Sequence, residues 1–289
     1  MCQKNQLKQK TFIKVNYLKK IGRYLNTIKY LKPKQIYFRI FYYFYKKPFF
    51  IPHKSINIRS GFRLKRFETK TNSILLDRKI KVFNNTYDLF VDNFWNQKIN
   101  KLELYELHYF DYLNNKGNSI NASKELIRKW IEDNQSFKGI GWESYTISLR
   151  LVNWIKFLVN NGISDKNISN SILQQALYLK KRKEYHLLGN HLFANLKALV
   201  FAFKFISFNG SNKILKDTII ELMKEIDGQI LDDGTHVEQS PMYHNLFLFD
   251  LLDLYNLFSS SERSDEISLS FLRDKILDLL KVSDILRHP

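Results

Sequence analysis

Apolar residues recur at helical spacing from about residue 98 to the end of the 289-residue sequence. Positions three or four residues apart are typical of an amphipathic helix, and short connections place consecutive helices side by side. We therefore expect a mainly α fold, either a bundle, a solenoid or an α/α toroid. The periodic segments cover residues 102–113, 127–131, 147–159, 172–179, 192–206, 214–231, 245–258 and 269–286.

The basic residues are distributed unevenly along the chain. The whole sequence has 46 Lys+Arg and 28 Asp+Glu, which gives a net charge of +18. Residues 1–67 contain 18 of these bases and no acid, so the remaining bases and acids balance in residues 68–289. We expect a basic N-terminal segment at 1–67, an irregular region with short strands at 68–97, and a helical domain at 98–289.

The basic segment contains a stretch, residues 17–47, that has helical spacing and many aromatic side chains. Pro33 either ends a first helix there or opens a second one. A basic amphipathic helix can contact an anionic surface peripherally, or it can pack on the main domain with a solvated basic face. Nucleic acid is not expected as a partner, because residues 68–289 are neutral and contain no nucleic-acid-binding motif.

Composition excludes several classes of protein. A chain that is 44% hydrophobic and 15% aromatic has enough apolar surface to fold. Its one cysteine, Cys2, excludes a disulfide framework and a thiolate metal cluster. No apolar run is long enough to span a membrane, and no secretory signal is visible. No nucleotide-binding loop is present, and the histidine spacing fits no common zinc pattern, so we expect neither a cofactor nor a metal.

Two segments, residues 184–195 and 232–244, place polar side chains where a loop meets an apolar helix. Asn190 and His191 open one helix, and Tyr243 and His244 open another. The N-terminus of a helix favours anions, so the two pairs could converge on one anionic ligand. Each residue also has a plain structural role available, as a helix cap, a buried histidine or a packed tyrosine ring.

Three motifs, in order, resemble the N-terminal helical domain of the heparinase II/III-like polysaccharide lyases. The likeness extends from about residue 20 onward, and Trp142 and the SLR at residues 148–150 fit it as well. The three motifs are LYELHYFDYL at 104–113, LGNHLFAN at 188–195 and EQSPMYH at 238–244.

The resemblance implies an α/α toroid followed by a C-terminal β-sandwich. We therefore expect an incomplete toroid, truncated before the sandwich and before a further catalytic residue. The implied activity is β-elimination on an acidic, uronic-acid-containing polysaccharide such as a glycosaminoglycan, by a lyase or by the substrate-binding helical part of one. The alternative is a non-catalytic protein that binds glycan or assembles surface polysaccharide. The family resemblance implies the bacterial periplasm or cell envelope, although no signal peptide is visible.

The resemblance also implies roles for individual residues. Asn190 matches the residue that neutralises the uronate carboxylate, and Tyr243 matches the tyrosine that acts as the acid and, in some members, as the base. His191 matches a neighbouring histidine that acts as a base or positions the substrate. The residues expected to bind substrate around these three are Glu238, His244 and His236.

Overall fold

The computed structural model describes residues 23, 26, 28–45, 56–59, 63–65, 73–76, 79–89, 91, 94–115, 117–135, 137–260 and 265–286. The chain divides into two units. The smaller comprises residues 1–46 with 185–188, and the larger comprises 47–184 with 189–289. Residues 47–67 thus group with the helical body, and the boundaries expected at residues 67 and 97 stay predictions.

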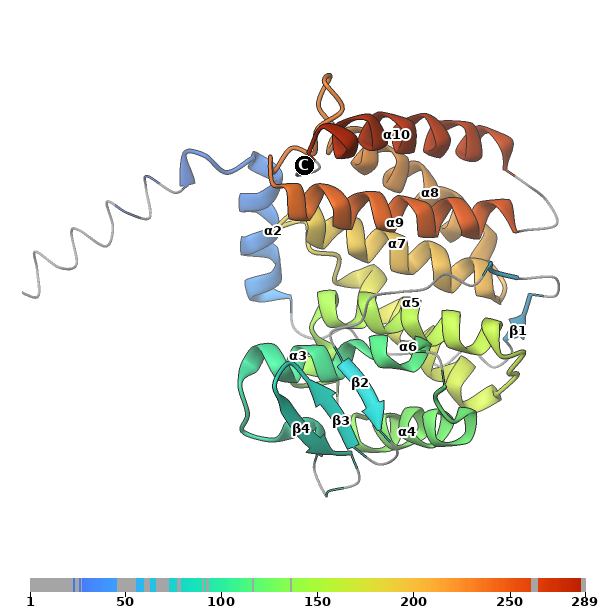
Figure 1. Cartoon of the computed structure of the whole chain (residues 1–289). Coiled ribbons are helices and arrows are strands. Elements are labelled where there is room, and N and C mark those ends of the chain that lie inside the picture. The colour runs from blue at the N-terminus through green and yellow to red at the C-terminus, as the bar shows by residue number, and fades with distance from the viewer. Residues whose placement is uncertain are drawn as a thin grey trace, which may run out of the picture. The chain divides into compact units, whose positions relative to one another are not determined.

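The larger unit is built from helices that lie against one another along the chain (Figure 1). Within the described residues, the 3-10 turn η1 (Phe94–Asn96) precedes these helices, and η2 (Asp111–Asn114) and η3 (Ile140–Trp142) lie between some of them. The helices are α3 (Lys101–Tyr109), α4 (Ile120–Asp133), α5 (Ser144–Asn160), α6 (Lys166–Lys181), α7 (Gly189–Phe205), α8 (Ser211–Asp227), α9 (Pro241–Ser259) and α10 (Glu266–Ile285).

Local sequence determines where several of these helices begin. The side chains of Asn100, Ser119 and Asp165 accept hydrogen bonds from backbone N–H groups in the first turns of α3, α4 and α6. These N–H groups have no acceptor inside the helix, so each cap supplies one. Helix α9 begins with Pro241, whose missing N–H is no loss at that position.

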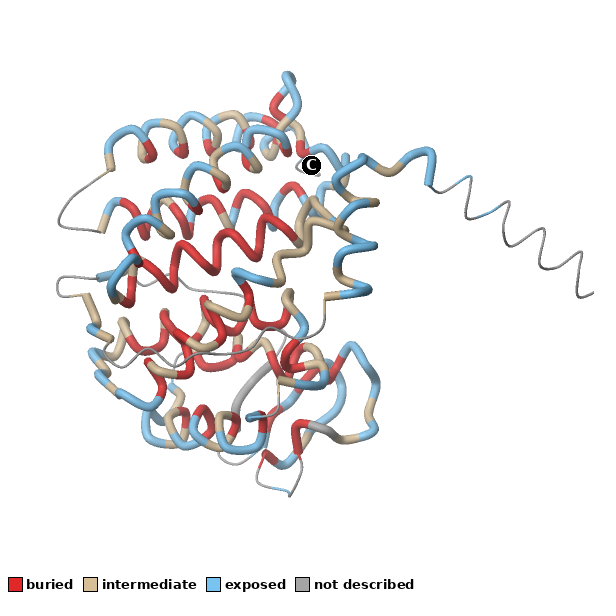
Figure 2. Tube along the Cα trace, turned by 180° about the vertical axis from the view of Figure 1, so that it is seen from behind, coloured by how far each residue is buried: buried red, intermediate tan, exposed pale blue. Residues whose placement is uncertain are grey.

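Helix α7 is the core of the larger unit. It contacts α5, α6, α8 and α9 and is buried along most of its length (Figure 2). Its residues from Leu192 to Phe205 are apolar except for the buried Asn195 and Lys197 and the partly exposed Lys204. A helix that is apolar all round can be covered only by neighbours on every side, as this one is.

The part of the chain that the structure describes also contains two small sheets. Strands β2 (Ser73–Leu76), β3 (Lys79–Val82) and β4 (Asn85–Asp88) form an antiparallel sheet in that order. Strands β1 (Asn57–Ile58) and β5 (Ile206–Ser207) pair antiparallel at the end of α7. Next to this pair, Arg59 donates to the backbone oxygen of Phe203 at 3.2 Å and to Asn212 Oδ1 at 2.7 Å. Residues 57–59 of the basic segment are therefore held on the helical body.

A buried polar cluster joins α3, α5, α6 and η3. Arg150 is fully buried, and its guanidinium donates to Gln175 Oε1 at 2.8 Å, to the His108 carbonyl at 3.3 Å and to the Gly141 carbonyl at 2.7 Å. The guanidinium also lies 3.8 Å from the centroid of the Trp130 ring. These contacts replace the water that a buried charge loses. We call Arg150, Gln175, His108, Gly141 and Trp130 the arginine cluster.

His108 is neutral within this cluster. Its Nδ1 accepts from Trp130 Nε1 at 2.9 Å, so its Nε2 carries the proton and donates to the Trp95 carbonyl at 3.2 Å. Burial, with the nearby Arg150 charge, lowers the pKa of His108 to about 3. The family motif at 104–113 therefore contributes a structural histidine to the interior of the domain.

The predicted fold class is confirmed: the described residues are mainly helical, with a few short strands. Each of the eight periodic segments contains a helix, and the short strands expected within residues 68–97 are β2, β3 and β4. Pro33 opens α2 (Pro33–Phe44). The extension of one helix through Ile206 is wrong, because Ile206 pairs with Ile58 as a strand.

Most of the helix expected before Pro33 lies outside the described residues. None of the described helices is long and apolar enough to cross a membrane.

Candidate functional site

Strained backbone precedes both helices that carry the predicted site residues. Leu188 and Gly189 have φ values of +63° and +55° at the start of α7, and Gln239 has a φ of +50° just before α9. Left-handed conformations are costly for Leu and Gln, and they persist only where surrounding structure imposes them. Both turns lie inside the segments at 188–195 and 238–244, which makes this pair of helix N-termini the candidate site.

A direct hydrogen bond joins the two segments. Asn190 Nδ2, on the first turn of α7, donates to Glu238 Oε1 at 3.0 Å, across 48 residues of sequence. Glu238 lies in the loop before α9, two residues ahead of its N-cap Ser240. The bond uses one of the two amide hydrogens of Asn190, and the other has no acceptor among the described residues. Asn190 therefore keeps a donor for a ligand.

His191 belongs to a chain of polar contacts that runs into the core. Its Nδ1 lies 3.3 Å from Glu184 Oε2. Asn195 Nδ2, fully buried on α7, donates to the same Glu184 oxygen at 3.1 Å and to Ser148 Oγ at 3.0 Å. Asn195 Oδ1 also accepts from the Glu184 backbone N–H at 2.7 Å. These contacts fix the Glu184 carboxylate beside the imidazole of His191, whose Nδ1 is buried and makes no hydrogen bond among the described residues.

Tyr145, near the start of α5, connects His191 with Tyr243. The Tyr145 ring lies 4.7 Å from the His191 ring, centroid to centroid. Burial raises the pKa of Tyr145, and the charges of Asp250 and Glu184 and the nearby Tyr243 hydroxyl raise it further. Tyr243 is 38% exposed at the first turn of α9. The His191 ring therefore contacts Tyr145, whereas Tyr243 acts on Tyr145 through its charge alone.

Two more tyrosines extend this group toward α3. The Tyr109 ring lies 6.1 Å from the Tyr145 ring, and Tyr105 stacks on Tyr109 at 6.3 Å. The Tyr105 hydroxyl donates to Glu143 Oε2. Burial raises the pKa of Tyr109, so its hydroxyl remains protonated at neutral pH. Tyr145, Tyr109 and Tyr105 therefore form a row of neighbouring phenol rings with neutral hydroxyl groups.

A buried ion network holds together the three helices that carry the site. Lys197 on α7 pairs with Asp250 at 2.6 Å and Asp253 at 2.7 Å, both on α9. Lys156 on α5 pairs with the same Asp253 oxygen at 2.6 Å. Removing one partner from such a network leaves a buried charge uncompensated, so the network constrains how α5, α7 and α9 pack.

His236 and His244 are placed differently from the other predicted residues. Both rings are buried. His244 Nε2 bonds to the Leu279 carbonyl at 2.9 Å, and His244 Nδ1 accepts from the His236 backbone at 3.3 Å. His236 Nε2 bonds to Gln229 Oε1 at 3.1 Å, and its Nδ1 accepts from the Glu238 backbone at 3.3 Å. With both ring nitrogens bonded inside the protein, these residues support the loop, and direct contact of either ring with substrate stays a prediction.

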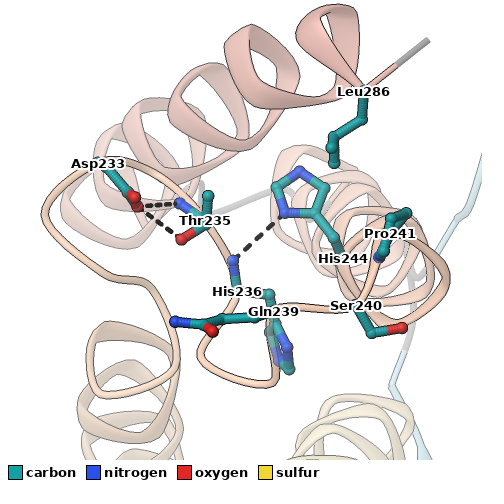
Figure 3. A pocket seen from close by; sticks show the side chains of 8 residues that line it. All are labelled: Asp233, Thr235, His236, Gln239, Ser240, Pro241, His244 and Leu286. Atoms are coloured by element: carbon teal, nitrogen blue, oxygen red, sulfur yellow. Dashed lines mark hydrogen bonds between the residues drawn. The ribbon is translucent and has the colours of Figure 1, made fainter. Parts of the chain in front are cut away.

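A small pocket lies beside this loop at the start of α9 (Figure 3). Its volume is about 230 Å³. Asn190, His191 and Tyr243 are not among the residues that line it, so it is separate from the Tyr145 neighbourhood. The lining residues are Asp233, Thr235, His236, Gln239, Ser240, Pro241, His244 and Leu286.

Three residues at the site, Glu184, Asn195 and Tyr145, were not predicted from the sequence. Asn195 did carry a signal, because it is an amide inside an otherwise apolar helix. Glu184 lies in a connection without periodicity, and Tyr145 is one of 16 tyrosines. We define the candidate site as Asn190, His191, Glu184, Asn195, Tyr145, Tyr243 and Glu238.

The candidate site combines three chemical functions within one neighbourhood. It has a neutral amide donor in Asn190, an imidazole with a carboxylate partner in His191, and a partly exposed phenol in Tyr243. Such a set can bind a carboxylate, accept a proton and donate one. Among the described residues, no three His, Cys, Asp or Glu side chains group as metal ligands would.

Comparison with known families gives a match over most of the chain. The family described as "Heparinase II/III N-terminus" matches residues 86–283. Comparison with curated proteins gives no match.

Solved structures with a similar arrangement include a heparinase III, with 19% identity and a TM-score of 0.48 over 68% of this chain and 33% of that one. A heparan sulfate lyase HepC mutant from Pedobacter heparinus has 18% identity and a TM-score of 0.43 over 69% of this chain and 35% of that one. The present chain thus spans about a third of the length of these structures.

Proposed function

We propose, because this chain belongs to the heparinase II/III N-terminal family, that it acts on an acidic polysaccharide as a lyase or as the substrate-binding helical part of one. The proposed reaction is β-elimination at a uronic acid. The observation that carries the proposal is the hydrogen bond from Asn190 to Glu238, which brings the two motif segments together while leaving Asn190 a second N–H.

The chemistry of the reaction explains why these residue types are needed. The proton next to the uronate carboxylate is weakly acidic, and its removal builds negative charge on the carboxyl group. A neutral hydrogen-bond donor must stabilise that charge, a base must take the proton, and an acid must protonate the departing glycosidic oxygen.

We assign these tasks to three residues. Asn190 donates its second N–H to the uronate carboxylate, and its bond to Glu238 fixes the orientation of the amide. His191 takes the proton, and the Glu184 carboxylate stabilises the resulting imidazolium. Tyr243 protonates the leaving oxygen, which its partial exposure on the first turn of α9 allows.

The proposal is tested by incubating the protein with uronate polymers and recording the ultraviolet absorbance of the unsaturated product. We expect steady growth of this signal with the wild-type chain, and a loss of about a hundredfold or more with Tyr243→Phe and with Asn190→Ala. Tyr255→Phe removes a hydroxyl elsewhere on α9 and should leave the rate unchanged.

Binding of the same polymers without any growth of absorbance would overturn elimination by this chain. That result would favour the alternative role, a non-catalytic glycan-binding protein. A signal that persists in Tyr243→Phe would overturn the role of Tyr243 as the acid.

A further inference from the structure

Helix α2 packs one face on the segment at residues 185–188, within the smaller unit. The Phe38 ring stacks on the Tyr185 ring at 4.4 Å, and Gln35 Nε2 donates to the Leu187 carbonyl at 3.1 Å. Lys34 Nζ lies 4.1 Å from the centroid of the same Tyr185 ring. Positions 34, 35 and 38 lie on one side of the helix, so this side of α2 already contacts residues 185–188.

A different side of α2 presents apolar side chains to solvent. Tyr37 is 62% exposed, Ile40 is 56% exposed and Phe44 is 74% exposed. The spacings of three and four residues place these side chains in one stripe along the helix. No residue of α2 is buried, and Figure 2 shows the helix without any buried position.

The charge around this stripe has one sign. Residues 1–67 contain 18 Lys+Arg and no Asp or Glu. Among the described residues of this segment, Lys29, Lys32 and Arg39 are exposed on or next to α2. A stripe of Tyr, Ile and Phe on a helix whose segment carries only basic charges is the pattern of a helix that lies in the surface of a membrane.

We propose that α2 docks on an anionic phospholipid surface. The stripe of Tyr37, Ile40 and Phe44 enters the boundary between head groups and acyl chains, and the surrounding bases pair with the lipid phosphates. A polysaccharide or a nucleic acid offers negative charge but no hydrocarbon layer to cover the stripe. A lipid surface offers both, so this anchor would hold the chain at a membrane face without a spanning helix.

The test uses the full chain and vesicles of phosphatidylcholine with about one third phosphatidylglycerol, separated by flotation. We expect the wild-type chain to float with these vesicles and to bind pure phosphatidylcholine at least about tenfold more weakly. Tyr37→Ser/Ile40→Ser/Phe44→Ser should lose most of this binding. Lys29→Gln/Lys32→Gln/Arg39→Gln should weaken it, and raising the salt from about 0.1 M to about 0.5 M should weaken it further.

A matched control removes three exposed apolar side chains elsewhere, in Ile220→Ser/Ile267→Ser/Leu277→Ser on α8 and α10. This variant should float as the wild type does. Equal loss in the control and the stripe variant, or no loss in the stripe variant, would overturn the proposal. So would an absence of vesicle binding combined with stripe-dependent binding to heparin or to single-stranded DNA. Helical content from circular dichroism checks that the variants remain folded.

Discussion

The arginine cluster and the candidate site are built from similar polar side chains but differ in exposure. Arg150 and His108 are buried, and their polar atoms bond inside the protein. At the candidate site, Asn190 keeps a free amide hydrogen and Tyr243 is partly exposed, next to helix starts with left-handed residues. The first arrangement suits a fixed structural element, and the second suits contact with a ligand.

The same difference in exposure divides the sequence motifs into two groups. The segments at 104–113 and 148–150 supply His108 and Arg150 to the arginine cluster. The segments at 188–195 and 238–244 supply the candidate site. All of these motifs are rich in polar and aromatic residues. Two of them therefore stabilise the fold, and the other two supply side chains that are available for chemistry.

Arg150→Met should have the largest effect on stability. Losing the guanidinium leaves Gln175 and two backbone carbonyls without their donor inside the core, so we expect the free energy of unfolding to fall by about 3–5 kcal/mol. Urea denaturation measures this loss. Arg128→Met is the matched control, because Arg128 pairs with Asp165 at 2.7 Å but is 45% exposed, and it should cost less than about 1 kcal/mol. Equal losses of stability in the two variants would contradict the distinction between the buried arginine cluster and an exposed ion pair.

Acid should destabilise the protein through His108. The unfolded chain takes up a proton on this residue as the pH falls through about 6.5, whereas the folded protein does so only near the lowered pKa of about 3. The unfolded state therefore binds more protons in that window, and His108 alone should lower the free energy of unfolding by about 1.4 kcal/mol per pH unit. An NMR titration checks the cause: the imidazole signal of His108 should not shift above about pH 4. A titration midpoint of His108 near pH 6.5 would contradict the exclusion of water from the arginine cluster.

Two glycines should respond to alanine for different reasons. A Cβ at Gly141 would lie 2.8 Å from His108 Cε1, so Gly141→Ala should cost about 2–3 kcal/mol through overpacking. At Gly189 the nearest atom, Glu238 Oε1, is 3.7 Å away, but φ is +55°, so only the strain of about 1 kcal/mol remains. Gly162→Ala, at φ +61° in open space, measures that strain alone. Thermal unfolding of the three variants would contradict this account if Gly141→Ala were no worse than Gly162→Ala.

Substitutions at the exposed part of the candidate site should have the smallest effect on stability. Asn190→Ala removes one exposed hydrogen bond, and Tyr243→Phe removes a partly exposed hydroxyl. We expect each to change the free energy of unfolding by less than about 1 kcal/mol, as measured by urea denaturation. A loss as large as that of Arg150→Met would show that these residues are structural.

Much of the fold could be predicted, because the helices bury one stripe or all of their surface and this leaves a periodic pattern in the sequence. The pairing of β1 with β5 could not, since two residues per strand are too few to form a pattern. The sequence indicated candidate site residues where polar residues open an apolar helix, as at Asn190 and Tyr243, and their roles stay predictions. Glu184 was missed because its role comes from contacts with Asn195 and His191 that the tertiary fold creates. His236 and His244 look like site residues in sequence, but their burial is a tertiary property.

The most direct test of the central claim is the affinity of a uronate oligosaccharide for the wild-type chain and for Asn190→Ala, measured by isothermal titration calorimetry. Our account predicts that the affinity falls at least about tenfold, or about 1.4 kcal/mol, because the carboxylate loses its amide donor. The fold should be retained in this variant, as urea denaturation will show. Equal affinity of the two proteins for the oligosaccharide would contradict the placement of the substrate carboxylate at Asn190.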